Sequence, residues 1–430
     1  MLRLLNRLLY PRGFSRNTLW KWPMVPARNL VTLNYGRALK AGARRPGTIP
    51  VYGTNGQCGW HNASLAKAPG LILGRKGQGP LGVEWCSKDF WVIDTAYFVS
   101  SLTDDLDLKY FYHLVNYVGL NHLKDGTSNP TLSRDSFGAQ LLPFPSLAEQ
   151  KAIAMVLSSF DDIIGLNRRM NETLEGIARA LFQSWFVDFD PVRAKLDGRP
   201  PAGTDQATAA LFPDAFQDSP LGPIPKGWDA IPLYDTAKWV NGAAFKNEDF
   251  CVAGEGLPVI KIGELKSGIS AQTKWCRRDA AEDKIIDTGD LVYSWSGSPD
   301  TSLEAFLWSG GVGLLNQHIF KVILPTAAQK RFVYYLLQYL RPLLVETARN
   351  KQTTGLGHVT IADMKRLLVC MPGKAILVAF DCYIAPVFEM AFNNTQQSRT
   401  LADLRDTLLP KLLSGELSVD EAGRRVGQAV

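Results

Sequence analysis

Short apolar runs alternate with Gly, Pro and Asn over residues 22–145, as in IPVYG, GLILGRKG and FWVIDTAYFV. Runs of this length between turn-forming residues predict β-strands. A helix is predicted at about 106–119, where apolar residues in LDLKYFYHLVNYVG recur at helical spacing. The second half repeats this order, with LPVIKIG, DLVYSWSG and LLNQHIFKVIL before the helical QKRFVYYLLQYLRPLL. Each half therefore predicts a mixed α/β domain with mostly antiparallel strands.

Two longer stretches have apolar residues at alternating spacings of four and three, which predicts helices that pack on each other as a coiled coil. An amphipathic helix that lies on a domain core gives a similar stripe. In each stripe an Asn stands at the same place, and we predict that Asn167 and Asn394 face one another midway along an antiparallel pair. The predicted stripes are Val156, Phe160, Ile163, Asn167, Met170, Leu174, Ile177 and Leu181, and Tyr383, Val387, Met390, Asn394, Gln397, Leu401, Leu404 and Leu408.

The two halves of the chain are copies of one unit. Lys124–Leu181 and Lys351–Leu408 align without a gap at a constant offset of 227 (351 minus 124). Trp22, Pro26, Gly36 and Lys40 align with Trp228, Pro232, Gly242 and Lys246 at an offset of 206 (228 minus 22). Such a duplication predicts two similar domains related by an approximate twofold, which suits a repeating ligand such as DNA.

Composition is that of a globular protein, with 430 residues, 46% hydrophobic and 20% charged. No apolar run approaches the roughly 20 residues of a membrane helix, so no membrane partner is expected. Six scattered cysteines without a CxxC pair favour reduced thiols in a cytoplasm and no zinc site. The net charge of +6 is concentrated in the first half, which favours a polyanionic partner.

Two segments lie outside the predicted domains and long helices. Residues 1–20 carry four Arg and no acid, as a mitochondrial presequence would, or as a short extension ahead of the first domain. Between the first long helix and the second domain, DPVRAKLDGRPPAGTDQATAALFPDAFQDSPLGPIPKG predicts a linker with at most one short helix.

Candidate DNA contacts are cations that can meet phosphates and polar side chains that can read base edges. In the turn Gly74-Arg75-Lys76-Gly77, either two cations face DNA or they are merely solvated. The candidates are Arg37, Lys40, Arg44, Arg45, Asn55, Arg75, Lys76, Gln78, Lys246, Lys261, Lys266, Lys274, Arg277, Arg278, Ser296, Gln317 and His318.

Signatures of catalysis are incomplete. Gly77–Gly82 formally matches GxGxxG, but a strand-like run follows it where a dinucleotide site needs a helix. Asn129-Pro130-Thr131-Leu132 lacks the second proline and the aromatic residue of an NPPY methyltransferase loop, and the PD-(D/E)xK nuclease motif is incomplete at Pro299-Asp300. The five His have no metal-ligand spacing. We expect neither catalytic nor metal-binding residues.

Residues Pro145–Lys195, with the sequence PSLAEQKAIAMVLSSFDDIIGLNRRMNETLEGIARALFQSWFVDFDPVRAK, strongly resemble the central conserved region of Type I restriction–modification specificity (S) subunits. Ser219–Trp228 (SPLGPIPKGW) is similar to the entry to their second target-recognition domain, and Leu401–Val419 (LADLRDTLLPKLLSGELSV) to their closing repeat. The resemblance spans the chain from Trp22 to Val419. The basic extension is atypical, and the second long helix lacks the pair Glu149-Gln150.

The resemblance implies an α+β fold in which two similar mixed α/β target-recognition domains are joined by two long conserved helices. These helices form an antiparallel coiled coil, with a pseudo-twofold internal repeat. The expected parts are a basic N-terminal extension (1–20), target-recognition domain 1 (21–145), a central conserved helix (146–189), a linker (190–225), target-recognition domain 2 (226–372), a C-terminal conserved helix (373–415) and a tail (416–430).

The resemblance further implies a non-catalytic subunit whose domains each read one half of an asymmetric bipartite site in double-stranded DNA. Its implied partners are two modification (methyltransferase) subunits that use S-adenosylmethionine and restriction (motor-nuclease) subunits that use ATP and magnesium, so no cofactor is expected in this chain. Two alternatives stay open: a fused enzyme with catalysis in the same chain, and a scaffold whose readers no longer bind DNA.

Overall fold

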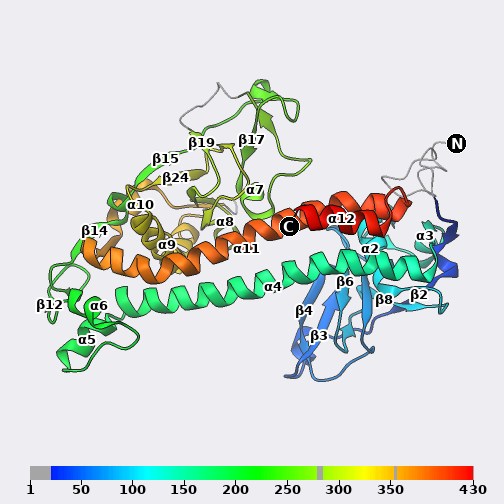
Figure 1. The fold of residues 1–430 in the computed structure, drawn as a ribbon, viewed down its shortest axis with the longest axis horizontal. Coiled ribbons are helices and arrows are strands. Elements are labelled where there is room, and N and C mark those ends of the chain that lie inside the picture. The colour runs from blue at the N-terminus through cyan, green and yellow to red at the C-terminus, as the bar shows by residue number, and fades with distance from the viewer. Residues whose placement is uncertain (1–20, 278–283, 353–355, 430) are drawn as a thin grey trace. The chain divides into compact units, whose positions relative to one another are not determined.

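The computed structural model describes residues 21–277, 284–352 and 356–429, so the basic extension 1–20 lies outside the described part. The chain divides into two compact units, one formed by Met1–Gly165 with Arg399–Val430 and the other by Leu166–Ser398. The helices α4 (Leu147–Phe186) and α11 (Lys374–Ser414) each contribute to both units (Figure 1).

The first unit contains a β-rich domain, called here the first domain. A four-stranded antiparallel sheet has the order β2-β8-β5-β6, and a three-stranded sheet has the order β4-β3-β7, with β3 and β7 parallel. The domain consists of β1 (Met24–Pro26), β2 (Val31–Tyr35), β3 (Ile49–Gly53), β4 (Gly56–His61), β5 (Gly70–Gly74), β6 (Val83–Cys86), β7 (Trp91–Val92), β8 (Ala96–Ser101), α2 (Leu108–Val118), β9 (Lys124–Asp125), β10 (Thr131–Leu132), α3 (Arg134–Gly138) and β11 (Leu141–Pro143).

Helix α2 fastens the first domain to the helices of its unit. It begins after Asp107, whose carboxylate accepts the Tyr110 N–H at 2.8 Å, and it ends at Gly119, where φ is 70°. Its apolar face, including Tyr110 and Phe111, belongs to a core shared with the sheet and with both long helices. The helix residues in this core include Ile153, Leu157, Phe160, Leu408 and Leu412.

The second unit repeats this architecture in the second domain. Its four-stranded sheet has the order β15-β24-β20-β22, and β17 pairs parallel with β23 as β3 does with β7. The domain consists of β14 (Asp229–Pro232), β15 (Lys238–Asn241), β16 (Phe250–Cys251), β17 (Leu257–Ile260), α7 (Ile262–Ser267), β18 (Trp275–Cys276), β19 (Ile285–Ile286), β20 (Leu291–Ser294), β21 (Ser296–Gly297), α8 (Pro299–Ser302), β22 (Glu304–Leu307), β23 (Gly313–Leu315), β24 (Ile319–Ile323), α9 (Ala327–Arg349), β25 (Gly357–His358), α10 (Ile361–Arg366) and β26 (Leu368–Met371).

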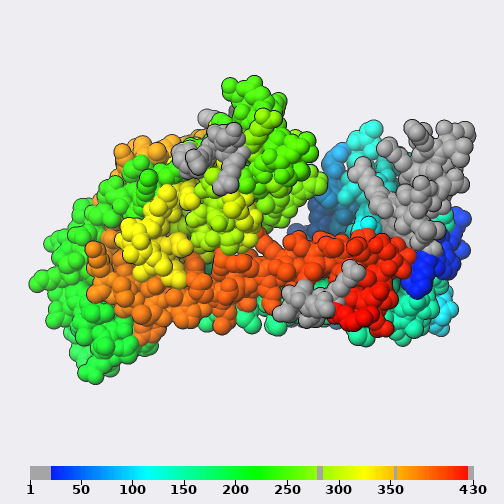
Figure 2. Space-filling view, turned by 45° about the horizontal axis from the view of Figure 1, so that its top comes forward, coloured from blue at the N-terminus to red at the C-terminus, as the bar shows by residue number. Residues whose placement is uncertain are grey.

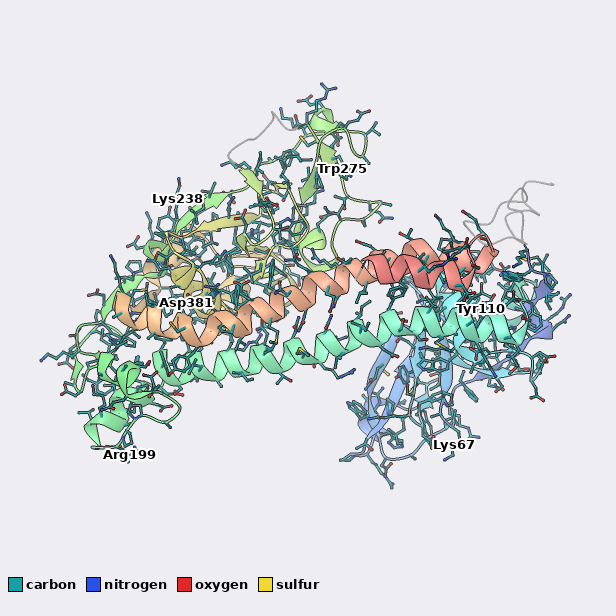
Figure 3. The ribbon with its side chains drawn as sticks, viewed as in Figure 1. Lys67, Tyr110, Arg199, Lys238, Trp275 and Asp381 are labelled. Atoms are coloured by element: carbon teal, nitrogen blue, oxygen red, sulfur yellow. The ribbon has the colours of Figure 1, made fainter. Side chains whose placement is uncertain are left out.

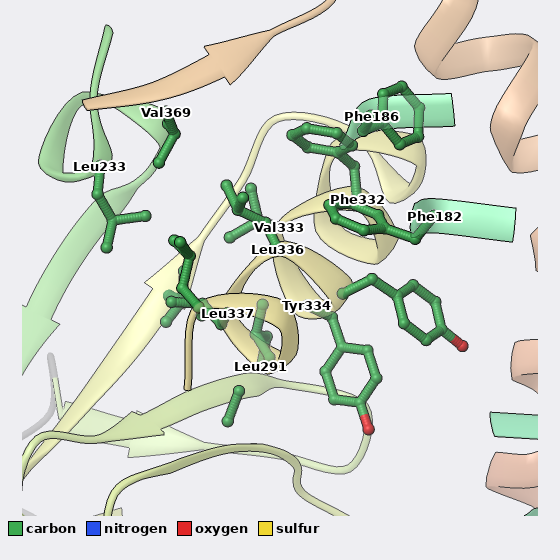
Figure 4. Packing of buried hydrophobic residues seen from close by; sticks show 14 of the residues in the cluster. Phe182, Phe186, Leu233, Leu291, Phe332, Val333, Tyr334, Leu336, Leu337 and Val369 are labelled. Carbon is green, nitrogen blue, oxygen red and sulfur yellow. The ribbon is translucent and has the colours of Figure 1, made fainter. Parts of the chain in front are cut away.

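An aromatic core holds the second domain against its helices. Figure 4 shows Phe182 and Phe186 of α4 beside Phe332 of α9. The ring centroids of Phe182 and Phe186 lie 5.6 Å and 5.0 Å from that of Phe332, and Phe186 also lies 4.9 Å from Phe380 of α11. Buried aromatic rings of this size dominate the energetics of a core.

Backbone hydrogen bonds repeat at the same offsets as the sequence. The Ala27 N–H donates to the Gln140 carbonyl at 2.8 Å, and the Leu233 N–H donates to the Leu367 carbonyl at 2.8 Å. These pairs differ by 206 at the donor (233 minus 27) and by 227 at the acceptor (367 minus 140). The internal duplication predicted from sequence is therefore present in the fold.

In the second unit, α4 and α11 pack antiparallel through a polar ladder. The Asn171 side chain donates to the Ala391 carbonyl at 3.0 Å and accepts from Asn394 Nδ2 at 2.9 Å. One turn away, buried Asn167 donates to Gln397 Oε1 at 2.8 Å and to the Asn394 carbonyl at 3.3 Å. Asn167 thus meets the backbone of Asn394, while the Asn394 side chain takes Asn171 as its partner.

The observed contact face of each helix contains only part of the predicted stripe: Phe160 and Asn167 of α4 and Leu401 and Leu408 of α11 are buried, as predicted. Ile163, Met170, Ile177 and Met390 are exposed, so their placement in the helix interface was wrong. The contact face instead includes Ile164 and Ala178 of α4, packed in the cores of the two units. Apolar spacing alone could not show that Asn171, a polar residue, belongs to the contact face.

Helix α11 is long and apolar enough to cross a membrane by length and composition, with a mean hydropathy of 1.7 over 18 residues. This differs from the sequence expectation of no such run. Of these 18 residues, 33% are buried. Buried residues of α11, such as Phe380 and Ile384, pack in the core of the second unit. Figure 2 shows the first part of α11, in orange, at the surface of that unit. The core helix of a globular protein can have the same length and composition, so these two properties are weak evidence of a membrane span.

The linker contains two short helices, α5 (Asp190–Leu196) and α6 (Gln206–Leu211), rather than at most one. The Tyr383 hydroxyl donates to Asp205 Oδ2 at 2.8 Å, and the Trp185 and Phe212 rings lie 4.9 Å apart. Arg199, labelled in Figure 3, belongs to this segment. The middle of the linker therefore contacts both long helices, α4 through Trp185 and α11 through Tyr383.

His113 of α2 is buried against α4 in the first unit. Its Nε2 lies 3.2 Å from Ser158 Oγ, and its Nδ1 lies 3.9 Å from Asp161 Oδ2. Burial, assisted by the charges of Lys109 and Arg405, lowers the pKa of His113 to about 3. The imidazole is therefore neutral near pH 7 in the folded chain.

We predict that Asn171 and Asn394 are energetically coupled. Asn171→Ala and Asn394→Ala should each destabilise the chain, and the double variant should lose less than their sum by about 0.5–1.5 kcal/mol, because one side-chain hydrogen bond is shared. Urea unfolding of the four proteins measures this coupling. Asn393→Ala, at an exposed neighbouring position, is the control and should leave stability nearly unchanged. Strict additivity would contradict the ladder.

We predict that His113 makes the folded chain sensitive to acid. Since its folded pKa lies below its ordinary value of about 6.5, its contribution is fully present above about pH 6.5 and is lost as pH falls toward 3. The unfolding free energy should fall by up to about 1.4 kcal/mol per pH unit in this window from this group. Urea unfolding of His113→Gln should show a shallower pH slope. Equal slopes for the two proteins would refute the assignment.

Candidate nucleic-acid interface

Four loops of the first domain meet where β5 ends. The Arg75 N–H donates to the Thr95 carbonyl at 2.9 Å, and the Arg75 carbonyl accepts the Leu132 N–H at 2.7 Å. The Thr54 hydroxyl donates to the Lys76 carbonyl at 2.8 Å. These bonds fix the turn after β5 between the β3–β4 turn, the loop before β8 and the segment that contains β10.

Arg75 and Lys76 are held by the domain itself. The Arg75 guanidinium lies over the rings of Tyr35 and Tyr97, at 4.7 Å and 5.5 Å, and its Nη1 donates to the Asp94 carbonyl at 3.0 Å. Lys76 Nζ pairs with Asp94 Oδ2 at 3.1 Å. Both sequence interpretations, contact with DNA and simple solvation, assumed that the two cations were free. In the fold, aromatic rings lie against Arg75 and a carboxylate pairs with Lys76.

Lys124, which sequence reasoning did not single out, stiffens the same turn. Its Nζ donates to the carbonyls of Gly77 and Gly79 at 3.2 Å and 2.9 Å. The Gln78 amide donates to the Thr127 and Ser128 carbonyls at 3.0 Å and 2.9 Å. Lys124 opens the duplicated segment and aligns with Lys351, and this repetition was the signal that could have found it.

A basic loop, residues 37–45, lies on the three-stranded sheet of the first domain. Trp91 Nε1 donates to the Arg37 carbonyl at 3.0 Å, and the Arg45 N–H donates to His61 Nδ1 at 3.1 Å. The Arg44 guanidinium donates to the Cys58 carbonyl. Lys40 is exposed, and among the described residues no carboxylate forms an ion pair with Arg37, Lys40 or Arg45.

The candidate cations of the second domain are also mostly exposed. Lys246 lies 3.6 Å from Glu248, Lys266 donates to the Thr301 carbonyl, and Lys274 lies 6.0 Å from the centre of the Phe250 ring. Lys261 and Arg277 are exposed. Figure 3 shows Lys67 and Trp275 on the parts of the first and second domains that face away from the helices of their own unit. Arg278 lies outside the described residues.

An aromatic and polar cluster stands at the equivalent end of the second domain. The Trp295 N–H donates to the His318 carbonyl at 3.3 Å, and the Val359 N–H donates to the Trp295 carbonyl at 2.9 Å, as at Arg75. The Trp295 ring stacks on Phe320 at 5.7 Å, and its Nε1 donates to Asn241 Oδ1 at 3.1 Å. Trp295 thus occupies the position that Arg75 occupies in the first domain.

Ser296, Gln317 and His318 differ in exposure. Ser296 is 3% exposed and its hydroxyl lies 2.7 Å from His358 Nδ1, so it is a structural residue and cannot read a base edge, contrary to the sequence expectation. Gln317 and His318 are exposed, and Asn55 is exposed in the first domain. Burial and nearby His358 lower the pKa of His318, so its ring is neutral near pH 7.

The chemistry available at both domains is recognition by cations and amides. Exposed Lys and Arg can pair with phosphates, and amide and imidazole groups can hydrogen-bond base edges. Within the described ranges, no group of three or more His, Cys, Asp or Glu side chains could hold a metal ion.

Comparisons with known proteins agree with this chemistry. Residues 21–176 match the family described as Type I restriction modification DNA specificity domain. The Type I restriction enzyme MjaIX specificity subunit of Methanocaldococcus jannaschii is 28% identical over 326 residues, which cover 74% of this chain and 71% of that protein. The HindI specificity subunit of Haemophilus influenzae is 26% identical over 338 residues, covering 67% and 71%.

The fold has a counterpart among solved structures. The S subunit of a Type I restriction–modification system from M. genitalium aligns over 94% of this chain and 99% of that chain, with a TM-score of 0.54 and 16% sequence identity. The likeness shows the shared fold and confirms the predicted α+β class with two β-rich regions and long packed helices. The chain belongs to the family of Type I restriction–modification DNA specificity subunits.

Proposed function

We propose that each domain of this specificity subunit reads one half of an asymmetric bipartite site in double-stranded DNA. One observation carries the proposal. The two domains repeat the same backbone hydrogen bonds while they carry different side chains at equivalent positions, such as Arg75 and Trp295. A repeated scaffold suits a ligand with two similar half-sites, and different side chains give the halves different sequences.

The basic loop and the exposed lysines of the second domain supply affinity in this proposal. Arg37, Lys40 and Arg45 in the first domain and Lys261 and Lys274 in the second would pair with phosphates. Such contacts position the protein without reading sequence, and they make binding sensitive to salt. Exposed amides such as those of Asn55 and Gln317 are placed to contribute sequence information.

The helix pair sets the spacer between the half-sites. A polar group at a helix interface fixes register, because any slip leaves donors and acceptors unpaired. The bonds between Asn171 and Asn394 and between Asn167 and Gln397 supply such groups. A slip of one heptad would move one helix along the other by roughly 10 Å, about three base pairs.

The helices also recruit the partner subunits. In the second unit, α4 leaves Leu166 and Ile177 50% and 53% exposed, and α11 leaves Val378 58% exposed. Exposed apolar residues at helical spacing on a long helix fit a docking helix of a partner. We assign these faces to two modification subunits, with restriction subunits completing the complex.

The catalytic chemistry resides in those partners. S-adenosylmethionine belongs to the modification subunits, and ATP and magnesium belong to the restriction subunits, while this chain supplies specificity and holds no cofactor. The site of action is the cytoplasm.

Exchange of one domain is expected to change one half of the recognised site. The first domain, residues 21–145, is replaced by that of a relative, and the methylated motif is mapped by sequencing the DNA of cells that also carry the modification subunit. The half-site read by the first domain should change while the other half and the spacer stay the same. Exchange of residues 226–372 is the reciprocal control. A change in both halves from one exchange would contradict independent reading.

A charge placed on the exposed face of α4 is expected to weaken assembly. Ile177→Glu should lower the affinity for the modification subunit roughly tenfold to a hundredfold, because an apolar contact of about 1.5–3 kcal/mol is replaced by a buried carboxylate. Titration calorimetry or co-purification measures this. Arg168→Glu, on a different face of the helix and 82% exposed, is the control. Equal affinity for both variants and the unaltered chain would exclude this face.

A further inference from the structure

Equivalent turns of the two domains carry different side chains. The loop before β8 holds Asp94 and Thr95, and the loop between β23 and β24 holds Gln317 and His318. Arg75, which follows β5, donates its N–H to the Thr95 carbonyl at 2.9 Å. Trp295, which follows β20, donates its N–H to the His318 carbonyl at 3.3 Å. Asp94 and Gln317 therefore occupy equivalent positions in the two domains.

Asp94 is occupied within the first domain. Its carboxylate pairs with Lys76 Nζ at 3.1 Å, and its carbonyl accepts Arg75 Nη1 at 3.0 Å. Gln317 is exposed, and among the described residues its side chain has one contact, 3.4 Å from its Nε2 to His318 Nε2. The Gln317 amide is therefore available to a ligand, whereas the Asp94 carboxylate is partly neutralised by Lys76 and can only accept hydrogen bonds.

Backbone hydrogen bonds hold both sides of the loop that carries Gln317. The Asn316 N–H donates to the Ile260 carbonyl at 3.0 Å, and the Ile319 N–H donates back to the Asn316 carbonyl at 3.1 Å. The Trp295 ring lies 5.8 Å from the His318 ring and is itself stacked on Phe320. A fixed backbone spares the entropy cost of ordering the loop on binding, so only the rotamer freedom of the Gln317 side chain is lost.

We propose that Gln317 is a specificity-determining residue of the second domain, whose amide hydrogen-bonds the major-groove edge of an adenine. The inference rests on the proposed function, since it requires the second domain to lie on DNA. A glutamine amide donates and accepts side by side, which matches the N7 acceptor and N6 donor of adenine. The first domain has no such donor–acceptor pair at the equivalent position, because the Asp94 carboxylate only accepts hydrogen bonds and is paired with Lys76.

The proposed contact between the Gln317 amide and adenine involves no charged group, whereas a phosphate contact pairs a cation with an anion. Loss of a phosphate contact weakens all sequences alike and reduces the slope of log affinity against log salt by about one. Loss of the Gln317 amide should relax one base position and leave the salt slope unchanged. Lys261→Ala, an exposed cation of the same domain, is the matched control for the first behaviour.

The test uses the full chain bound to its modification subunit and a library of double-stranded DNA randomised across both half-sites. Sequencing of the bound fraction should give a bipartite motif for the unaltered chain. Gln317→Ala should lower discrimination at one adenine position about tenfold or more, with the other half-site retained. Gln317→Glu should shift that position from adenine toward cytosine, because a carboxylate only accepts and cytosine N4 donates.

The outcomes separate this inference from the function on which it rests. If Gln317→Ala and Gln317→Glu select the same motif with the same discrimination as the unaltered chain, the inference is overturned and the proposed function stands. If the unaltered complex selects no motif, the proposed function itself fails. Loss of both half-sites in Gln317→Ala would also overturn the inference, because the retained half-site is the internal measure of a folded chain.

Discussion

Burial of one face of the two long helices is the interaction on which both units depend. In the first unit, α2 and its sheet share a core with α4 and α11 through residues such as Leu157 and Leu412. In the second unit, Phe332 of α9 packs against Phe186 and Phe380. Neither domain closes its core alone, because the apolar face of α2 or α9 is covered by the helices. The surfaces proposed to read DNA are therefore attached to the helices through the cores themselves.

Polar groups specify how those helices meet. A purely apolar interface tolerates sliding, since one leucine contact resembles the next. The side-chain bond from Asn394 to Asn171 at 2.9 Å and that from Asn167 to Gln397 at 2.8 Å exist in one register. Such bonds contribute about 1 kcal/mol each, but their loss on slipping costs more, because buried amides would be unpaired. A subunit proposed to measure a DNA spacer needs this property.

The two domains satisfy the same structural need with different chemistry. Arg75 covers the Tyr97 ring at 5.5 Å, and Trp295 covers the Phe320 ring at 5.7 Å, each from the residue that follows an equivalent strand. Both are flat groups that pack on an aromatic face. Neighbouring positions, such as Asp94 and Gln317, are then free to differ. Duplication of the scaffold with divergence at its loops gives one chain two similar domains with different surfaces, as the proposed reading of two half-sites requires.

The sequence by itself determined the duplication, the helices, the alternating strands and the family, because offsets, periodicity and motifs are local or repeated properties of the chain. Only the tertiary structure decided which face of α4 is buried. Ile163 and Ile177 are apolar but exposed, whereas the contact face contains polar Asn171, whose hydrogen-bond partners lie on a helix more than 200 residues away. Likewise, the sequence placed Arg75 on the surface. Its position over Tyr35 and Tyr97 arises only when separate strands are brought together, because contacts distant in the chain leave no periodic signal.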